Sequence, residues 1–315
     1  MALEAKRLRA IIGGSAGNLV EWYDWYAYSA LSLYFSASFF PKGDPTAQLL
    51  NTSAVFAVGF FMRPIGAYLM GRYADRHGRK AGLAVSVALM CAVSLMIAFA
   101  PTYATIGIAA PILLLVARLL QGLSVGGEYG ASATYLSEMA TRRHRGFWSS
   151  FQYVTLIGGM LSALAVTLLL QAVFTKAQMD SFGWRIAFAL GAALALGVYL
   201  LRRGLAETAS FRALAVDRPA SGMAALWRAH PREFLLVGAI SAGGGLAFYA
   251  YTTYMQKFLA NTVGFSVQTA TAIMTAALVV FMLVQPLFGA LADRVGRKPM
   301  LLLFGIGGAI VSVPV

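Results

Sequence analysis

The sequence predicts an all-α protein that crosses a membrane several times. Hydrophobic residues make up 59% of its 315 residues and charged residues only 12%, and the mean hydropathy is +0.70. A soluble domain of this length could not bury so much apolar surface. A spanning helix needs about 20 mostly apolar residues, and nine such runs cover residues 11–38, 51–71, 81–100, 107–138, 148–173, 185–201, 234–258, 268–291 and 299–315.

The basic residues alternate between the loops that join these runs. Nineteen of the 25 Lys and Arg residues fall in the N-terminal tail and in every second loop, and four fall in the loops between them. Lys and Arg collect on the cytoplasmic side of membrane proteins, so the pattern predicts a multi-pass protein with a cytoplasmic N-terminus. This topology explains the formal net charge of +13. The sequence has no basic surface interleaved with stacking aromatics, so it does not predict a nucleic-acid partner.

A ten-residue motif occurs twice, at residues 71–80 and 289–298. Its spacing, G-x-x-A-D-R-x-G-R-K, is identical in both copies, and each copy closes one apolar run and precedes the next. A polar loop repeated in this way is typical of a transporter built from two similar halves. We therefore expect an N-terminal six-helix bundle over residues 1–203, a cytoplasmic connector over 204–233 and an incomplete, three-helix C-terminal bundle over 234–315.

We interpret the two copies of the motif as cytoplasmic latches. Gly71 and Gly289 are expected to permit close approach and a turn. Asp75 and Asp293 are expected to accept from an arginine or to cap a helix N-terminus, and the basic residues to face head groups. The predicted latch residues are Gly71, Asp75, Arg76, Gly78, Arg79, Gly289, Asp293, Arg294, Gly296 and Arg297.

Two carboxylates lie within the first apolar run. Glu21, Asp24 and Tyr28 are spaced i, i+3 and i+7, so they share one helix face, and Asn18 adds a fourth polar group to it. Charged side chains in a membrane helix normally face the bundle interior or a wet cavity. Such a pair can take up a proton from one side and release it to the other, which predicts proton coupling by Glu21 and Asp24. The alternative is a permanent salt bridge that fixes helix packing.

Two arginines also lie inside apolar runs. Arg118 keeps its charge and needs an anion, which can be Asp24, Glu21 or an anionic substrate. Glu128 lies on the same helical stripe and joins the predicted proton-coupling residues. Arg63 lies too deep to reach the head groups easily, and an arginine fork binds a carboxylate through two hydrogen bonds. We predict that Arg63 and Arg118 bind an anionic substrate, with ion pairing to another helix as the alternative.

Further polar groups could contact a small ligand. Gln152 and Tyr153 in the fifth run and Tyr249 and Tyr254 in the seventh are predicted to hydrogen-bond it, although aromatics near helix ends also mark the membrane interface. The sequence has no Walker loop, no ligand-like cluster of Cys and His, and no serine–histidine arrangement. It therefore predicts neither an enzyme nor a metal site.

These residues resemble the major facilitator superfamily, in which the repeated motif lies between helices two and three and between helices eight and nine. Within the superfamily, residues 18–24, 59–66 and 118–129 are similar to the branch of metabolite–proton symporters. The resemblance implies the superfamily's twelve-helix fold, with about nine helices present here. It also implies a substrate cavity between the two bundles. The second latch is expected to meet helix five, while helix eleven, the partner of the first latch, is not among the nine.

The resemblance further implies symport of 2-oxoglutarate, a dicarboxylate, with protons across the bacterial inner membrane by alternating access. The proton gradient would drive transport without a cofactor, and the carrier is expected to be a monomer in the lipid bilayer. Three alternatives remain open at this point. The cargo could be another organic acid such as citrate, or a zwitterionic osmolyte such as proline or betaine, or the chain could be a truncated remnant that does not transport.

Overall fold

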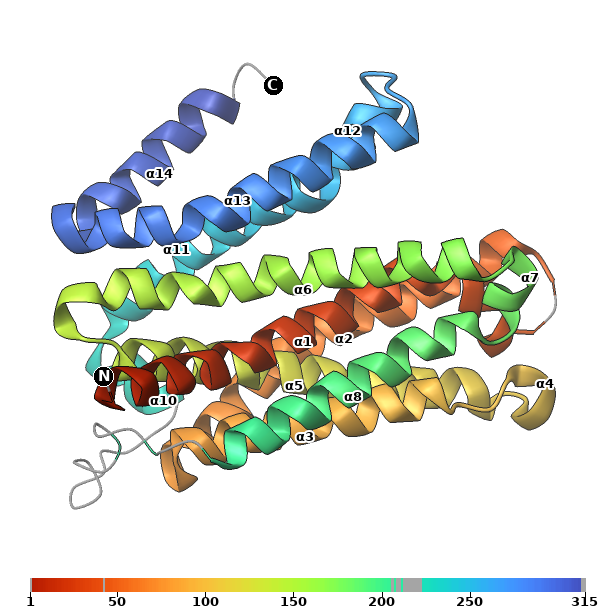
Figure 1. Ribbon diagram of the computed structural model, residues 1–315, viewed down its shortest axis with the longest axis horizontal. Coiled ribbons are helices and arrows are strands. Elements are labelled where there is room, and N and C mark those ends of the chain that lie inside the picture. Colours follow the sequence, from red (N-terminus) through yellow and green to blue (C-terminus); the bar gives the residue numbers. More distant parts are fainter. Residues whose placement is uncertain (1, 42, 205–206, 208–210, 212–222, 313–315) are drawn as a thin grey trace. The chain divides into compact units, whose positions relative to one another are not determined.

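The computed structural model describes residues 2–41, 43–204, 207, 211 and 223–312. These residues form helices joined by short turns, and no strand occurs among them; Figure 1 shows the helices in chain order. The predicted all-α class is confirmed. The chain divides into two compact units. Unit 1 comprises Met1–Ala140 and Thr155–Asp217, and unit 2 comprises Thr141–Val154 and Arg218–Val315.

Unit 1 is a bundle of long helices. Its elements are α1 (Ala2–Phe39), α2 (Pro45–His77), α3 (Arg79–Ala98), α4 (Tyr103–Ile106), α5 (Ala109–Met139), the greater part of α6 (Arg145–Val173), α7 (Lys176–Gln178), the π-helical turn η2 (Met179–Gly183) and α8 (Trp184–Arg203). The closest packing between long helices joins α2 to α5 and α3 to α8. Helix α1 contacts α2, α3, α5 and α8, so it lies at the centre of the unit.

Unit 2 contains the start of α6 and the helices that follow the connector. Its elements are η1 (Arg142–His144), residues 145–154 of α6, α10 (Met223–Ala229), α11 (Pro231–Tyr249), the π-helical turn η3 (Ala250–Tyr254), α12 (Met255–Asn261), α13 (Val267–Val295) and α14 (Arg297–Ser312). Most of the predicted connector, 204–233, lies outside the described residues, so its boundaries stay a prediction.

Seven helices among the described residues are long and apolar enough to cross a membrane. Helix α1 is not one of them, although it has 38 residues. Its polar and aromatic side chains lower its hydropathy, and most of its middle residues are buried against other helices. A helix that faces protein rather than lipid needs no continuous apolar surface. The 16 described residues of α14 are too few for the same test.

An aromatic cluster packs one end of unit 1. Phe35, Phe39, Trp184 and Phe188 are fully buried. The ring centroids of Phe35 and Trp184 lie 5.6 Å apart, and those of Trp184 and Phe188 lie 6.2 Å apart. The edge-to-face and tilted arrangements suit the ring quadrupoles. This packing joins α1 to α8, the first and last long helices of the unit.

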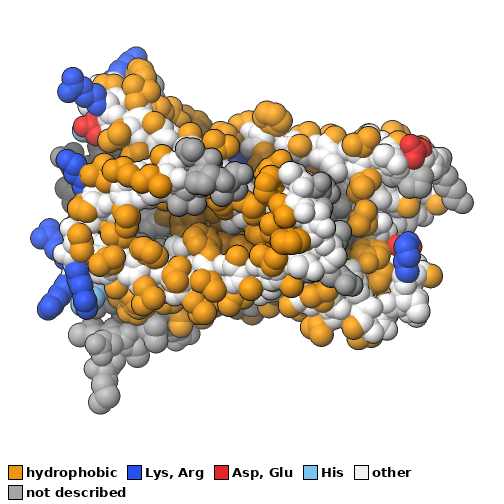
Figure 2. Space-filling view, turned by 90° about the horizontal axis from the view of Figure 1, so that it is seen from above, with side chains coloured by type: hydrophobic (Ala, Val, Ile, Leu, Met, Phe, Trp, Pro, Cys, Tyr) orange, Lys and Arg blue, Asp and Glu red, His pale blue; other side chains and the backbone are white. Residues whose placement is uncertain are grey.

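The outer faces of the helices are apolar. Phe61 of α2 is 77% exposed and Leu33 of α1 is 68% exposed, and Figure 2 shows hydrophobic side chains along the flanks of the helices with Lys and Arg at helix ends. Exposed apolar surface on this scale would be a liability in water. It is the surface that a lipid bilayer requires.

The repeated motif is mostly helical, which corrects the prediction that it forms a loop. Helix α2 continues to His77 and α3 begins at Arg79, so one residue, Gly78, makes the turn with φ of 111°. Gly296 makes the equivalent turn between α13 and α14, with φ of 99°. The predicted turns at Gly71 and Gly289 are wrong because both lie inside helices. Only glycine adopts these positive φ values without strain.

The two glycines of the first motif predict opposite effects of alanine. We expect Gly78→Ala to lower the free energy of unfolding by about 1–3 kcal/mol, because a Cβ at this φ is strained. Gly71 lies in α2, where an added methyl group would meet no neighbouring atom within 4 Å, so Gly71→Ala should raise stability by up to about 1 kcal/mol through helix propensity. Thermal melting in detergent measures both, and equal shifts would contradict the turn assignment.

Candidate functional site

The acidic face of α1 points into unit 1. Glu21 is 1% exposed and Asp24 is fully buried. Asn18 donates to Thr155 Oγ1 at 3.1 Å, and the Tyr28 hydroxyl donates to the backbone oxygen of Thr52 at 3.2 Å. The predicted face is therefore a buried polar stripe directed at neighbouring helices, and its carboxylates lie away from lipid.

Asp24 is connected to Arg118 through an amide. Gln121 donates from Nε2 to Asp24 Oδ2, and its Oε1 accepts from Arg118 Nη1. All three side chains are fully buried. The neutral side chain of Gln121 thus lies between the buried carboxylate of Asp24 and the buried guanidinium of Arg118. The sequence analysis did not predict this bridging position of Gln121.

Glu21 has a different environment. Its Oε1 lies 3.3 Å from the Ser124 hydroxyl oxygen, and the single proton of that hydroxyl is shared between Glu21 and the backbone oxygen of Ser86 in α3, which lies at 2.9 Å. Ser86 Oγ donates to the Ser124 backbone oxygen at 3.0 Å. Among the described residues, neither Glu21 nor Asp24 forms an ion pair within 4.0 Å. Both accept from neutral donors, so each carboxyl group can gain or lose a proton without breaking a salt bridge.

Aromatic rings surround the Arg118 guanidinium. Its Cζ lies 4.2 Å from the ring centroid of Trp25, 4.2 Å from that of Tyr28 and 4.6 Å from that of Phe56. The expectation that Arg118 pairs directly with Asp24 or Glu21 is wrong in this structure, because these rings and Gln121 occupy its surroundings. Guanidinium groups bind to ring faces most strongly when both are desolvated. Within the described residues, Arg118 Nε and Nη2 have no hydrogen-bond partner.

Arg63 shares one of these rings. Its Cζ lies 4.1 Å from the ring centroid of Trp25 and 4.4 Å from that of Phe60. Arg63 is half-buried, in contrast to the fully buried Arg118. Since each Cζ lies about 4 Å from the same centroid, the two guanidinium groups lie within about 8 Å of each other. The structure thus brings Arg63, Arg118, Glu21 and Asp24 together around α1.

Glu128 forms a buried ion pair that sequence reasoning missed. Its two oxygens accept from Arg202 Nη2 at 2.5 Å and Nη1 at 2.9 Å, and both side chains are at most 1% exposed. Arg202 also donates to the backbone oxygens of Gly13, Gly14 and Leu83. These bonds use all five N–H donors of the guanidinium and join α1, α3, α5 and α8. They favour a structural role for Glu128, whose proton-coupling role stays a prediction.

Breaking this pair should destabilise the protein strongly. We expect Arg202→Met to lower the free energy of unfolding by about 3–5 kcal/mol, because it leaves the Glu128 carboxylate buried without its cation. The double variant Glu128→Leu/Arg202→Met should recover much of that loss, since removing both charges leaves no buried charge without its partner. Denaturant unfolding in detergent measures each variant. A double variant no more stable than Arg202→Met would contradict this account.

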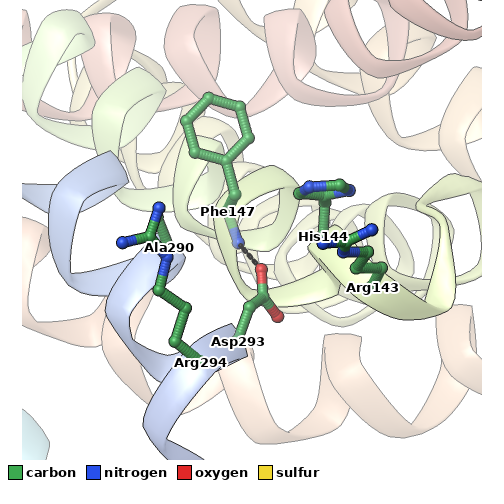
Figure 3. A pocket seen from close by; sticks show the side chains of 6 residues that line it. All are labelled: Arg143, His144, Phe147, Ala290, Asp293 and Arg294. Carbon is green, nitrogen blue, oxygen red and sulfur yellow. Dashed lines mark hydrogen bonds between the residues drawn. The ribbon is translucent and has the colours of Figure 1, made fainter.

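The second motif binds the start of α6, as the resemblance implied for helix five. The Asp293 carboxylate accepts from the backbone N–H groups of Gly146 at 2.7 Å and Phe147 at 2.9 Å, and Figure 3 shows it directed from α13 to the Phe147 nitrogen. A carboxylate at a helix N-terminus satisfies free N–H donors and complements the helix dipole. The predicted capping role of Asp293 is therefore present in the geometry.

Close backbone contact supports this cap. A Cβ built on Gly289 would lie 2.6 Å from the Gly146 oxygen, so glycine permits the approach of α13 to α6 there. An open cavity of about 320 Å³ adjoins the cap, and its lining includes Arg143, His144 and Arg294. Figure 3 shows these basic side chains around the Asp293 carboxylate. The expected close approach at Gly289 is confirmed, although its turn is not.

The first motif makes different contacts. Asp75 of α2 pairs across the Gly78 turn with Arg79 at the start of α3, which matches the expected arginine partner. The N-terminus of α3 is capped instead by Glu207, whose oxygens accept from the backbone N–H groups of Arg79 at 3.1 Å and Lys80 at 3.2 Å. Lys80 Nζ donates to the Arg203 backbone oxygen at 2.8 Å. Sequence reasoning missed Glu207, because nothing in the connector distinguishes it from a solvated charge.

Hydrogen exchange can test the cap at α6. We expect Asp293→Ala to lower the protection of the Gly146 and Phe147 amides and the free energy of unfolding by about 1–2 kcal/mol, the usual loss for removing a helix cap. Asp75→Ala is the matched control, since its carboxylate contacts Arg79 and not α6. Faster exchange of the α6 amides in both variants would show that the effect is not due to capping.

The remaining predicted ligand residues lie in unit 2. Gln152 and Tyr153 lie near the start of α6, and Tyr249 and Tyr254 end α11 and η3. The rings of Tyr153 and Phe248 have centroids 6.4 Å apart, and Tyr254 is 60% exposed. A π-helical turn at η3 is a feature often found at functional sites. Ligand binding by these four residues stays a prediction, as do the roles of Arg76 and Arg297.

No group of three His, Cys, Asp or Glu side chains in the described part of the chain could hold a metal ion.

Comparisons with known proteins are consistent with a membrane carrier. Residues 10–219 match the family described as "Sugar (and other) transporter". The chain is 55% identical to the alpha-ketoglutarate permease of Escherichia coli (strain K12) over 98% of its own length and 71% of that protein. It is 34% identical to the citrate-proton symporter of Klebsiella pneumoniae and 31% identical to the proline/betaine transporter of Escherichia coli (strain K12), and it spans 67% and 64% of their lengths.

Solved structures support the same fold. The proton:xylose symporter XylE of the major facilitator superfamily superposes with a TM-score of 0.75 at 19% identity, covering 94% of this chain and 71% of that one. A multi-pass helical bundle with charges buried among its spanning helices is the architecture of a membrane transporter. The chain belongs to the sugar (and other) transporter family and has the major facilitator fold of that structure, as the resemblance seen in its sequence implied.

Proposed function

We propose that the protein carries 2-oxoglutarate together with protons across the bacterial inner membrane, with its N-terminus in the cytoplasm. The observation that carries the proposal is the juxtaposition of two arginines with two carboxylates that have no ion-pair partner among the described residues. The 55% identity to a protein named alpha-ketoglutarate permease supports this choice of cargo. The proton gradient is the driving force, and the chain needs no cofactor for it.

The arginines suit a dianionic cargo. Arg63 and Arg118 lie within about 8 Å of each other, and each can bind a carboxylate through two parallel hydrogen bonds. Two buried nitrogens of Arg118, Nε and Nη2, have no hydrogen-bond partner in the described residues. The Arg63 side chain as a whole is less buried than that of Arg118, so we assign the first carboxylate to Arg63. As the carrier closes around the cargo, Arg118 receives the second.

The acids suit proton transfer. Asp24 and Glu21 accept from neutral groups, Gln121 and Ser124, so they can be protonated without loss of an ion pair. When a dianion occupies the arginines, a proton on Asp24 reduces the negative charge that crosses the low-dielectric interior. Glu128 is held by Arg202 and is the weakest of the three proposed proton carriers.

The roles of arginine and acid can be separated by kinetics. We expect Arg63→Ala to raise the KM for labelled 2-oxoglutarate about 10- to 100-fold, which corresponds to the loss of a charge-assisted hydrogen bond. Arg63→Lys should be intermediate because it keeps the charge but loses the fork. Transport into proteoliposomes measures both, and an unchanged KM in Arg63→Ala would remove Arg63 from the cargo site.

Substitution of the acids should affect energy coupling rather than binding. We expect Asp24→Asn to retain exchange of internal for external 2-oxoglutarate while losing accumulation driven by a pH gradient. Glu128→Gln is the comparison, since its main expected effect is on stability. If Asp24→Asn and Glu21→Gln both accumulate 2-oxoglutarate as the unmodified protein does, the proton-coupling assignment is wrong.

A second candidate keeps the mechanism and changes the cargo. Relatives named as a citrate-proton symporter and a proline/betaine transporter support it. A zwitterion has one carboxylate and needs one cationic contact fewer than a dicarboxylate. Competition of 2-oxoglutarate uptake by citrate, proline and betaine distinguishes these cargoes. The preferred cargo should also stabilise the folded protein by mass action, by about 2.7 kcal/mol at 100 times its Kd, and so raise its melting temperature. A chain that no such compound stabilises would be a remnant without transport.

A further inference from the structure

Trp25 occupies a distinctive place between the two arginines. Its ring centroid lies 4.1 Å from Arg63 Cζ and 4.2 Å from Arg118 Cζ. The side chain is 4% exposed and follows Asp24 directly in α1. One indole ring on α1 therefore contacts a cation on α2 and a cation on α5.

The two cations differ in their other contacts. Arg63 is half-buried and lies against Phe60 as well as Trp25. Arg118 is fully buried and is joined through Gln121 to Asp24. A path of contacts thus runs from a half-buried arginine, across one ring, to a buried arginine and then through the Gln121 amide to a buried carboxylate.

We propose that Trp25 couples the binding of cargo at Arg63 to the protonation of Asp24. The inference rests on the proposed function, because it assigns the cargo to Arg63 and the proton to Asp24. A cation binds to the face of an indole ring through the ring quadrupole. When Arg63 forms a bidentate pair with a carboxylate, its attraction for the ring weakens, and the balance of forces on Trp25 shifts towards Arg118.

That shift reaches Asp24 through bonded contacts. Arg118 and Asp24 hold opposite ends of the Gln121 amide, so a displacement of the guanidinium changes the hydrogen bond that the carboxylate receives. The effect is reciprocal. If binding of the cargo at Arg63 changes the affinity of Asp24 for a proton, then protonation of Asp24 changes the affinity for the cargo by the same factor. Trp25 acts here as a positioning residue, since it need not touch the cargo or the proton.

Neighbouring rings provide matched controls. Phe56 lies 4.6 Å from Arg118 Cζ and Phe60 lies 4.4 Å from Arg63 Cζ. Both rings pack on Trp25, with centroids 5.0 and 4.8 Å away. Phe56→Leu removes a ring from the Arg118 side and Phe60→Leu removes one from the Arg63 side, whereas Trp25→Leu removes the ring in contact with both.

The test compares two rates in proteoliposomes for each variant. One is the exchange of internal for external 2-oxoglutarate, and the other is accumulation driven by a pH gradient. We expect Trp25→Leu to lower the ratio of accumulation to exchange about 10-fold or more, within the usual range of allosteric coupling. Trp25→Phe should lower it only about 2- to 3-fold, because phenyl binds cations less strongly than indole does. Phe56→Leu and Phe60→Leu should each stay within about 2-fold of the unmodified protein.

Two results would overturn the inference. One is a Trp25→Leu protein whose ratio matches that of the unmodified protein, and the other is an equal fall in Phe56→Leu or Phe60→Leu, which would indicate general packing. If Trp25→Leu does not insert, Trp25→Phe decides, and a ratio equal to that of the unmodified protein counts against coupling. Failure of the unmodified protein to exchange 2-oxoglutarate at all would instead refute the proposed function, and the inference with it.

Discussion

Charge compensation inside a low-dielectric bundle is the constraint that shapes unit 1. Three acids and two arginines are buried there, with Arg63 half-buried beside them. Each unpaired buried charge lowers the stability of the folded protein, and two different arrangements compensate the buried charges here. The Arg202–Glu128 pair is direct, completely hydrogen-bonded and joined to the backbone of α1 and α3. The Asp24–Gln121–Arg118 chain is indirect and leaves donors and acceptors free among the described residues. The first arrangement suits a fixed structural support, and the second suits a site that changes its protonation and its ligand.

The two copies of the repeated motif each combine a glycine turn with a nearby carboxylate that caps a helix N-terminus. Gly78 and Gly296 reverse the chain with positive φ, and carboxylates satisfy free N–H groups at the starts of α3 and α6. The two copies reach this result differently. In unit 2 the carboxylate belongs to the motif, at Asp293, whereas in unit 1 it comes from Glu207 beyond α8. Identical sequence spacing therefore supplies the same turn twice, while the element that completes each contact is set by the surrounding fold.

Much of this could be predicted from the sequence, and the failures have physical causes. The apolar runs correspond to helices in the described part of the chain, because lipid leaves the backbone few other ways to satisfy its hydrogen bonds. Helical spacing also placed Glu21 and Asp24 correctly on a buried face. The prediction that the motif forms a loop was wrong because its polar residues continue the helices up to Gly78 and Gly296. Partners far apart in sequence were not foreseen, since Arg202 resembles any basic residue at a helix end and nothing in the sequence marks Trp25. Only the folded bundle shows that Arg202 meets Glu128 and that Trp25 meets two arginines.

If cargo and protons cross together, the pH inside the vesicles changes as the cargo enters. Proteoliposomes with a pH-sensitive dye inside, and with no imposed gradient, receive external 2-oxoglutarate while uptake of the labelled compound is followed in parallel. We expect the lumen to acidify at the rate of uptake, and the acidification to disappear with Asp24→Asn although exchange continues. Uptake of 2-oxoglutarate without any change of luminal pH would contradict proton coupling.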